Sequence, residues 1–104
     1  MIRVEFHRQN DRLIGYTVSG HAGAGSQGED IVCAAVSSAA YMAANTITDI
    51  VRADTVAKAQ DGYMHVIVTD RVPACQDILQ GFLLHMQQIQ TQYPDRVHLT
   101  ITEV

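Results

Sequence analysis

The chain has 104 residues, of which 47% are hydrophobic and 17% are charged, and its formal net charge at pH 7 is -4. A chain of this length forms one domain around a single core, and this composition excludes intrinsic disorder. Lys58 is the only lysine and no run of basic residues occurs, so we expect no direct binding of nucleic-acid phosphates.

The N-terminal sequence MIRVEFHRQN alternates polar and apolar residues and lacks the apolar core of a signal peptide. Apolar stretches elsewhere are too short, or too rich in serine and threonine, to predict a membrane span. The two cysteines, Cys33 and Cys75, are too few for a disulfide framework and do not form a CxxC pair. We therefore expect a cytoplasmic protein with two reduced thiols and neither a zinc site nor another cofactor.

In chain order, the alternating residues 2–7 predict a strand, and the turn residues that follow lead to a second strand over residues 12–19. These two strands are expected to form a hairpin. Residues 20–30 contain four glycines and predict a loop. The alanine-rich residues 31–52 predict a long helix.

The second half of the chain shows a similar order of predicted elements. Residues 56–60 and 63–69 alternate around Asp61-Gly62, a strong hairpin turn. A second helix is predicted from Pro73 to Tyr93, and residues 97–103 predict a last strand. The order β-β-α-β-β-α-β favours an α+β two-layer sandwich, with a mainly antiparallel sheet and two long helices in one domain over residues 1–104.

The segment over residues 19–40 carries the chemistry. Cys33 lies near the predicted start of the first helix, and His21 lies on the glycine-rich loop that leads into it. A cysteine attacks as the thiolate, which a helix N-terminus and a neighbouring imidazolium both favour. Cysteines among alanines and valines are more often small buried apolar residues, and a histidine after a strand is more often a surface residue. The residues alone leave both interpretations open.

The neighbours of this pair have candidate supporting roles. Asp30 either orients His21 or caps the helix, and Ser37 lies one turn after Cys33 on the same face, where it either contacts the site or packs. Backbone amides at the helix start are candidate donors to an oxyanion. Glycines that allow a peptide to approach closely, or that form an ordinary connector, are Gly20, Gly23, Gly25 and Gly28.

The remaining cysteine and histidines are assigned no chemistry. Cys75 is predicted to face the core from the second helix. The histidines with no cysteine or carboxylate partner at ligand spacing are interpreted as structural or surface residues. They are His7, His65, His85 and His98.

Two dense motifs flank the glycine-rich loop: Gly20-His21-Ala22-Gly23, and Gly28-Glu29-Asp30-Ile31-Val32-Cys33-Ala34-Ala35-Val36-Ser37. They resemble the signature of the ribosomal-processing cysteine protease family known as Prp. The resemblance implies a homodimeric cytoplasmic peptidase that removes a short N-terminal extension from large-subunit ribosomal protein twenty-seven, cutting after an aromatic pair. It also implies that Cys33 is the nucleophile and His21 the general base.

One segment departs from the family pattern. Family members often carry a bulkier residue after Gly23, whereas this chain has Ala24-Gly25-Ser26-Gln27, so the loop's contacts with substrate are expected to differ. Two alternatives remain open on the residues. One is a non-enzymatic ribosome-assembly partner that uses Cys33 only for packing. The other is a thiol redox module, although it would lack CxxC and an obvious second thiol.

Overall fold

The computed structural model describes residues 1–20 and 27–104, with the backbone alone for residues 27–30. The elements follow the predicted order. They are β1 (Ile2–Gln9), β2 (Arg12–Ser19), α1 (Gln27–Asn45), η1 (Thr46–Val51), β3 (Thr55–Gln60), β4 (Tyr63–Val68), η2 (Val72–Cys75), α2 (Gln76–Gln92) and β5 (Val97–Glu103).

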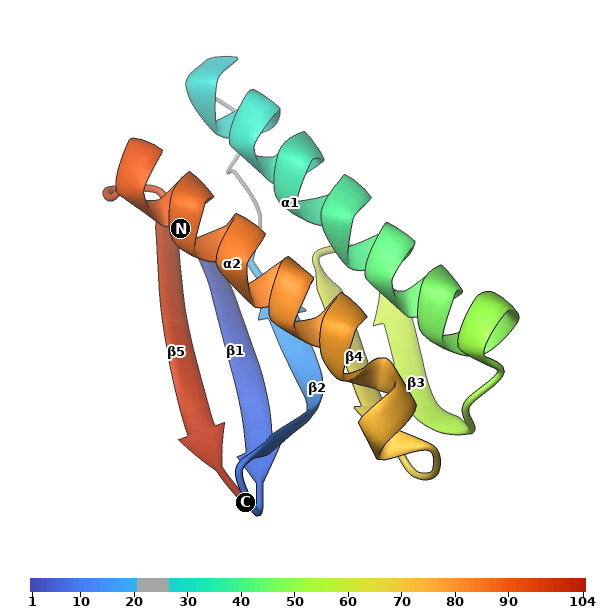
Figure 1. Ribbon diagram of the computed structural model, residues 1–104. Helices are drawn as coiled ribbons and strands as arrows, with labels where there is room; N and C mark the ends of the chain where they lie inside the picture. The colour runs from blue at the N-terminus through green and yellow to red at the C-terminus, as the bar shows by residue number, and fades with distance from the viewer. Residues whose placement is uncertain (21–26) are drawn as a thin grey trace.

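The five strands form one sheet in the order β3-β4-β2-β1-β5. Neighbouring strands are antiparallel, except that β5 runs parallel to β1. Both long helices lie side by side on one face of this sheet (Figure 1). The predicted α+β two-layer sandwich with a mainly antiparallel sheet is therefore confirmed.

Alternation in the strands sends one set of side chains toward the helices. In β1, Ile2, Val4 and Phe6 are buried, while their neighbours in the sequence are more exposed. Asn10 and Asp11 have φ values of 52° and 64°, the left-handed pair that a two-residue hairpin between β1 and β2 requires. The alternation and the turn together set which residues of the hairpin reach the core.

Three aromatic rings join the two layers. Phe82 of α2 packs against Phe6 and Tyr16, with ring centroids 5.2 Å and 4.7 Å apart. The hydroxyl of Tyr16 also donates a hydrogen bond of 2.7 Å to the backbone oxygen of Ala40, in the middle of α1. Tyr16 thus links the sheet to both helices, and its burial raises the pKa of its phenol.

The boundaries of the first helix differ from the prediction. α1 begins at Gln27, so the last four residues of the predicted loop over residues 20–30 are helical. Its acidic residues in the first turn suit a helix N-terminus, a signal that the glycines around them obscured. At the other end, regular α-helix stops at Asn45 and a π-helical segment, η1, continues to Val51.

Two threonines mark the change to π-helix. The Thr46 and Thr48 hydroxyls donate to the backbone oxygens of Met42 and Ala44 at 2.8 Å and 3.1 Å. Such back-bonding perturbs regular α-helical hydrogen bonding. Arg52 then ends the segment in the left-handed conformation, with φ of 62°. The second helix likewise begins in two steps, since the short 3₁₀ turn η2 carries the predicted Pro73 before α2 starts.

Residues Ile31–Val51 are long and apolar enough, with a mean hydropathy of 1.4, to cross a membrane by length and composition alone. The expectation that each apolar stretch is too short, or too rich in serine and threonine, to span a membrane was therefore wrong for this segment by length and composition. Core helices of soluble proteins pass the same test, and α1 packs Val32, Val36 and Ala43 into the core beneath it. The threonines and serines counted against a span lie among these apolar residues.

Candidate active site

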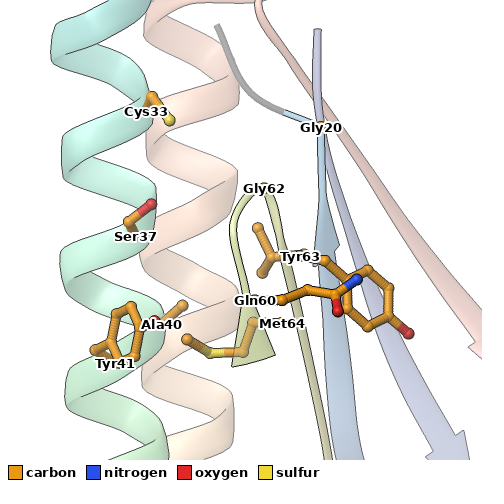
Figure 2. A pocket seen from close by; sticks show the side chains of 10 residues that line it. Gly20, Cys33, Ser37, Ala40, Tyr41, Gln60, Gly62, Tyr63 and Met64 are labelled. Carbon is orange, nitrogen blue, oxygen red and sulfur yellow. The ribbon is translucent and has the colours of Figure 1, made fainter. Parts of the chain in front are cut away.

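A small pocket opens between α1, the end of β2 and the hairpin of β3 and β4 (Figure 2). It encloses about 70 Å³, far less than the roughly 300–1,000 Å³ of sites that hold a whole small-molecule ligand. A volume of this size suits one side chain of a longer ligand. The lining residues are Val18, Gly20, Cys33, Ser37, Ala40, Tyr41, Gln60, Gly62, Tyr63 and Met64.

One stripe of α1 forms a wall of the pocket. Cys33, Ser37 and Tyr41 follow one another at intervals of four residues, so they lie on the same side of the helix. Cys33 is half-buried and packs against the core, while Tyr41 is 51% exposed. Figure 2 shows the sulfur of Cys33 and the hydroxyl of Ser37 on the side of α1 that faces Gly20 and the hairpin. The predicted proximity of Ser37 to Cys33 is thus present in the pocket.

Gly20 forms the opposite rim, where β2 ends. Its φ of 80° is left-handed, and a Cβ added here would lie 2.5 Å from the backbone oxygen of Met1. Its amide donates a hydrogen bond of 3.0 Å to the backbone oxygen of Gly62, at the tip of the β3–β4 hairpin. This bond ties the hairpin tip to the end of β2, so the two together form the side of the pocket that faces α1.

The observed start of α1 at Gln27 changes which backbone amides are free to bind an oxyanion. Because the helix begins at Gln27, the amide of Cys33 lies within the regular hydrogen-bonding pattern of α1. The free amides of a helix are those of its first turn, so oxyanion donors at this helix start would come from residues before Ile31. The expectation that backbone amides at the helix start serve as oxyanion donors stays a prediction.

The other predicted site residues are placed only in part. Gly28 and Asp30 lie in the first turn of α1, where the structure describes the backbone. His21, Gly23 and Gly25 lie outside the described residues. The predicted Cys33–His21 pairing therefore stays a prediction.

Several pocket residues were not anticipated from the sequence. Gln60, Tyr63 and Met64 come from the β3–β4 hairpin, which the Asp61-Gly62 turn had predicted as structure without function. Their position depends on β4 lying next to β2, a pairing that no local pattern reveals. The position of Tyr41 could have been predicted, because it lies eight residues after Cys33 and therefore on the same face of the helix.

The opposite face of the sheet carries a separate polar cluster. Thr17 Oγ1 lies 2.8 Å from His7 Nε2 and 2.7 Å from His65 Nδ1, so its hydroxyl bridges the two imidazoles. Burial lowers the pKa of His7. Across the described side chains of residues 1–20 and 31–104, no three histidine, cysteine or carboxylate groups gather as metal ligands. The cluster and the Cys33 pocket lie on different faces of the sheet.

Comparisons with known proteins cover almost the whole chain. The family model described as cysteine protease Prp matches residues 1–98. The essential ribosomal processing protease Prp from Staphylococcus aureus, in crystals with a substrate peptide, has a TM-score of 0.89 at 26% identity, covering 98% of this chain and 100% of that one. Its complex with a covalently linked product peptide has a TM-score of 0.86 at 27% identity, with the same coverage.

A crystal structure from Streptococcus mutans shares the fold as fully. It has a TM-score of 0.86 at 27% identity, covering 100% of this chain and 96% of that one. No curated protein matches the chain at a significant level. The likeness therefore extends over the complete sandwich rather than over the motif around Cys33 alone.

Proposed function

The chain belongs to the cysteine protease Prp family, whose members act in ribosomal processing, and from this premise we propose its substrate and its catalytic residues. We propose that it removes the short N-terminal extension of large-subunit ribosomal protein twenty-seven, cutting after an aromatic pair. Cys33 is the nucleophile in this proposal and His21 the general acid and base. The proposed place of action is the cytoplasm, where the substrate is made.

The observation that carries the proposal is the position of Cys33. Its half-buried side chain lines the pocket between α1 and the hairpin, so it is within reach of a bound peptide. Gly20 lines the same pocket and immediately precedes His21 in the sequence. A nucleophile and a base attached to the two rims of one pocket match the general arrangement of covalent catalysis.

The proposed reaction has two steps. His21 takes the proton of the Cys33 thiol, and the sulfur attacks the scissile carbonyl to give a tetrahedral intermediate. The C–N bond then breaks, His21 gives its proton to the leaving amine, and a thioester remains. In the second step His21 deprotonates a water that attacks the thioester, which releases the carboxylic acid and restores the thiol.

Two neighbours have supporting roles in the proposal. Asp30, in the first turn of α1, orients the imidazole of His21 and favours its protonated form through its negative charge. Ser37, one turn below Cys33, presents a hydroxyl to the backbone of the bound peptide from the wall of the pocket. Neither residue takes part in bond breaking.

A cleavage assay tests the proposal directly. The purified protein is incubated with the host's own ribosomal protein twenty-seven carrying its extension, and the shortening is followed by mass spectrometry. We expect complete cleavage by the wild type, and a loss of about 10³-fold or more in kcat/KM for Cys33→Ala and His21→Ala. Cys75→Ala is the matched control and should cut at the wild-type rate.

The same cleavage assay can contradict the proposed function. An extended protein left intact by the folded wild type would contradict the proposal. So would a Cys33→Ala variant that cuts as fast as the wild type. Circular dichroism of each variant separates loss of chemistry from loss of fold.

The proposal includes a homodimer, supported by the outer side of the helical layer. From Ile31 to Thr48 the sequence has no charged residue, and Ile31 and Met42 are 60% and 51% exposed. Leu84 of α2 is 55% exposed on the same layer. Exposed apolar surface without charge is typical of an interface.

Analytical ultracentrifugation tests the proposed homodimer. We expect a dimer that Met42→Glu dissociates and that the distant control Val104→Glu leaves intact. A wild type that stays a monomer at high concentration would contradict the proposed homodimer.

A further inference from the structure

The two edges of the sheet differ in how their backbone is satisfied. At the β5 edge, the amide of Leu99 donates a 2.6 Å hydrogen bond to Gln90 Oε1 of α2, and the amide of Val97 donates to the Tyr93 backbone oxygen at 3.3 Å. At the other edge, five of the six residues of β3 are exposed. No helix or side chain in the described part of the chain donates to or accepts from the outer backbone of β3. β3 therefore presents an open strand edge.

The register of β3 shows which backbone groups point outward. The Thr69 amide donates a 2.8 Å hydrogen bond to the Asp54 oxygen, and Gln60 faces Tyr63 across the two-residue turn. In an antiparallel pair, hydrogen-bonded residues alternate with residues whose backbone faces away from the partner. Asp54 and Gln60 are both even-numbered, so the odd-numbered residues turn their N–H and C=O groups outward. They are Thr55, Ala57 and Ala59.

The same odd-numbered residues leave room for another chain above the edge. Ala57 pairs with Val66 and Ala59 with Met64, and both partners are buried on the helix-covered face. The alanine methyl groups are themselves exposed. The helical layer thus does not cover the edge strand, and two of its side chains on this face are as small as a chiral residue allows.

This uncovered strip is continuous with the Cys33 pocket. Gln60, the last residue of β3, lines the pocket together with Cys33 and Tyr41 of α1. Figure 2 shows the hairpin beside the α1 wall, with its tip at Gly62 nearer to the level of Ser37 and with Cys33 lying beyond the tip. The eight helical steps from Cys33 to Tyr41 rise about 12 Å along the helix, which matches three to four residues of extended peptide at roughly 3.3 Å each.

We propose that the outer edge of β3 binds the substrate's N-terminal extension as a sixth strand, with the chain lying between β3 and α1 and its scissile bond at Cys33. This inference rests on the proposed function for the identity of the peptide. Binding by strand addition uses backbone hydrogen bonds for affinity and side-chain pockets for specificity. The pocket beside Cys33 then receives a side chain of the extension, and Thr55, Ala57 and Ala59 bind its backbone.

A second copy of the chain is the competing occupant of an open edge. Lys58, the only lysine, lies in the middle of β3, and a lysine on an edge strand discourages pairing between identical sheets. The continuity with the Cys33 pocket favours the substrate instead, because a strand added there leads directly to the nucleophile. The observations therefore favour a peptide over a second sheet.

The first test uses a synthetic peptide with the host's extension sequence and the Cys33→Ala variant, which binds without cutting. Each backbone nitrogen of the peptide is methylated in turn, which removes one donor and leaves the side chains unchanged. We expect Kd to rise about 5–10-fold at every second position, and to stay within about 2-fold at the positions between. No binding, no sensitive position, or a uniform response along the peptide would overturn the proposal.

The second test removes a donor from the protein. Ala57→Pro deletes an outward N–H and leaves the hydrogen bonds to β4 intact, the position at which an edge strand tolerates proline. We expect Kd for the peptide to rise about 5–10-fold, and KM to rise by the same factor in the active enzyme with kcat unchanged. Ile101→Pro is the control on the opposite edge, since its amide points outward as that of Leu99 does, and it should bind the peptide like the wild type.

The outcomes separate this inference from its rivals. A folded Ala57→Pro variant that binds like its control would overturn the proposal, and an unfolded one leaves the decision to the methylation series. If Ala57→Pro turned a dimer into a monomer at unchanged Kd, β3 would be a subunit interface and the proposal wrong. The cleavage assay is a separate measurement. A wild type that binds the peptide with alternating sensitivity to methylation but never cuts it would contradict the proposed function and still support binding of the peptide at the edge of β3.

Discussion

Cys33 and Cys75 both lie near the beginning of a helix, but the fold surrounds them differently. Cys75 occupies the position immediately before α2, and Cys33 lies six residues after the start of α1. By distance to a helix N-terminus alone, Cys75 is the better candidate for a stabilised thiolate. Yet Cys75 is completely buried in the core, whereas Cys33 lines a pocket.

The difference shows what makes a thiol available for chemistry in this fold. Burial raises the pKa of Cys75, because the thiolate would lose its hydration, and this effect outweighs the nearby charge of Arg71, which lowers the pKa. A substrate carbonyl also has no route to a side chain with no exposed surface. Access to a pocket therefore separates the two cysteines more sharply than their distance to a helix end.

Thiol labelling gives the largest expected contrast between the two cysteines. In the folded protein, iodoacetamide should modify Cys33 directly and Cys75 only through opening of the core, so we expect Cys75 to react at least about 100-fold more slowly. Mass spectrometry of Cys33→Ala and Cys75→Ala measures each rate separately. Equal rates in the folded state would abolish the distinction, and equal rates in urea are the control.

The residues that hold each cysteine in place provide the next contrast. Gln76, directly after Cys75, has an amide that donates to the Leu13 and Val72 backbone oxygens and accepts from the Leu13 amide, at 2.8–3.0 Å. Replacing it by alanine removes three hydrogen bonds and leaves the Leu13 backbone without its partners. We expect Gln76→Ala to lower the free energy of unfolding by about 2–3 kcal/mol, measured by urea denaturation.

A matched variant is available at the far end of α2. Gln90→Ala removes only the single hydrogen bond to the Leu99 amide and should cost about 1 kcal/mol. A loss at Gln76 no greater than that at Gln90 would show that the triple contact adds nothing. The hydrogen bonds of Gln76 would then not explain the stability of the structure around Cys75.

The two cysteines also mark what the sequence predicts well. The element order, β5 over residues 97–103 and the core position of Cys75 all follow from local periodicity, which the fold preserves. Ser37 was placed beside Cys33 from helical spacing alone. These features depend on residues close together in the chain.

What the sequence does not predict depends on long-range pairing or on mixed signals. Tyr63 and Met64 reach the Cys33 pocket only because β4 pairs with β2, which brings the hairpin tip to Gly20. The helical first turn from Gln27 was hidden among glycines that indicate a loop. Consequently the pocket's α1 wall was predictable and its hairpin wall was not.

Substitution of the cysteines themselves should separate them by stability. Cys75→Ala removes a buried sulfur from a packed core and should cost about 1–2 kcal/mol, close to the loss for other small deletions there. Cys33→Ala removes a half-exposed sulfur and should cost less than about 0.5 kcal/mol. Urea titration of the two variants gives the comparison, and a larger loss at Cys33 would assign that thiol to the core.

The last contrast concerns a hydrogen bond to the helix that carries Cys33, and its expected effect is a small one. Tyr16→Phe keeps the ring against Phe82 and removes the hydrogen bond to Ala40, so we expect a loss of about 1 kcal/mol. Because burial raises the phenol pKa above its usual 10.0, ionisation favours the unfolded chain. The advantage of wild type over Tyr16→Phe should thus be constant from pH 6 to 9 and shrink above pH 10. A difference that persists above pH 10 would show that the phenol ionises equally in the folded and unfolded states. The hydrogen bond from Tyr16 to α1 would then not explain how the helix that carries Cys33 is held in place.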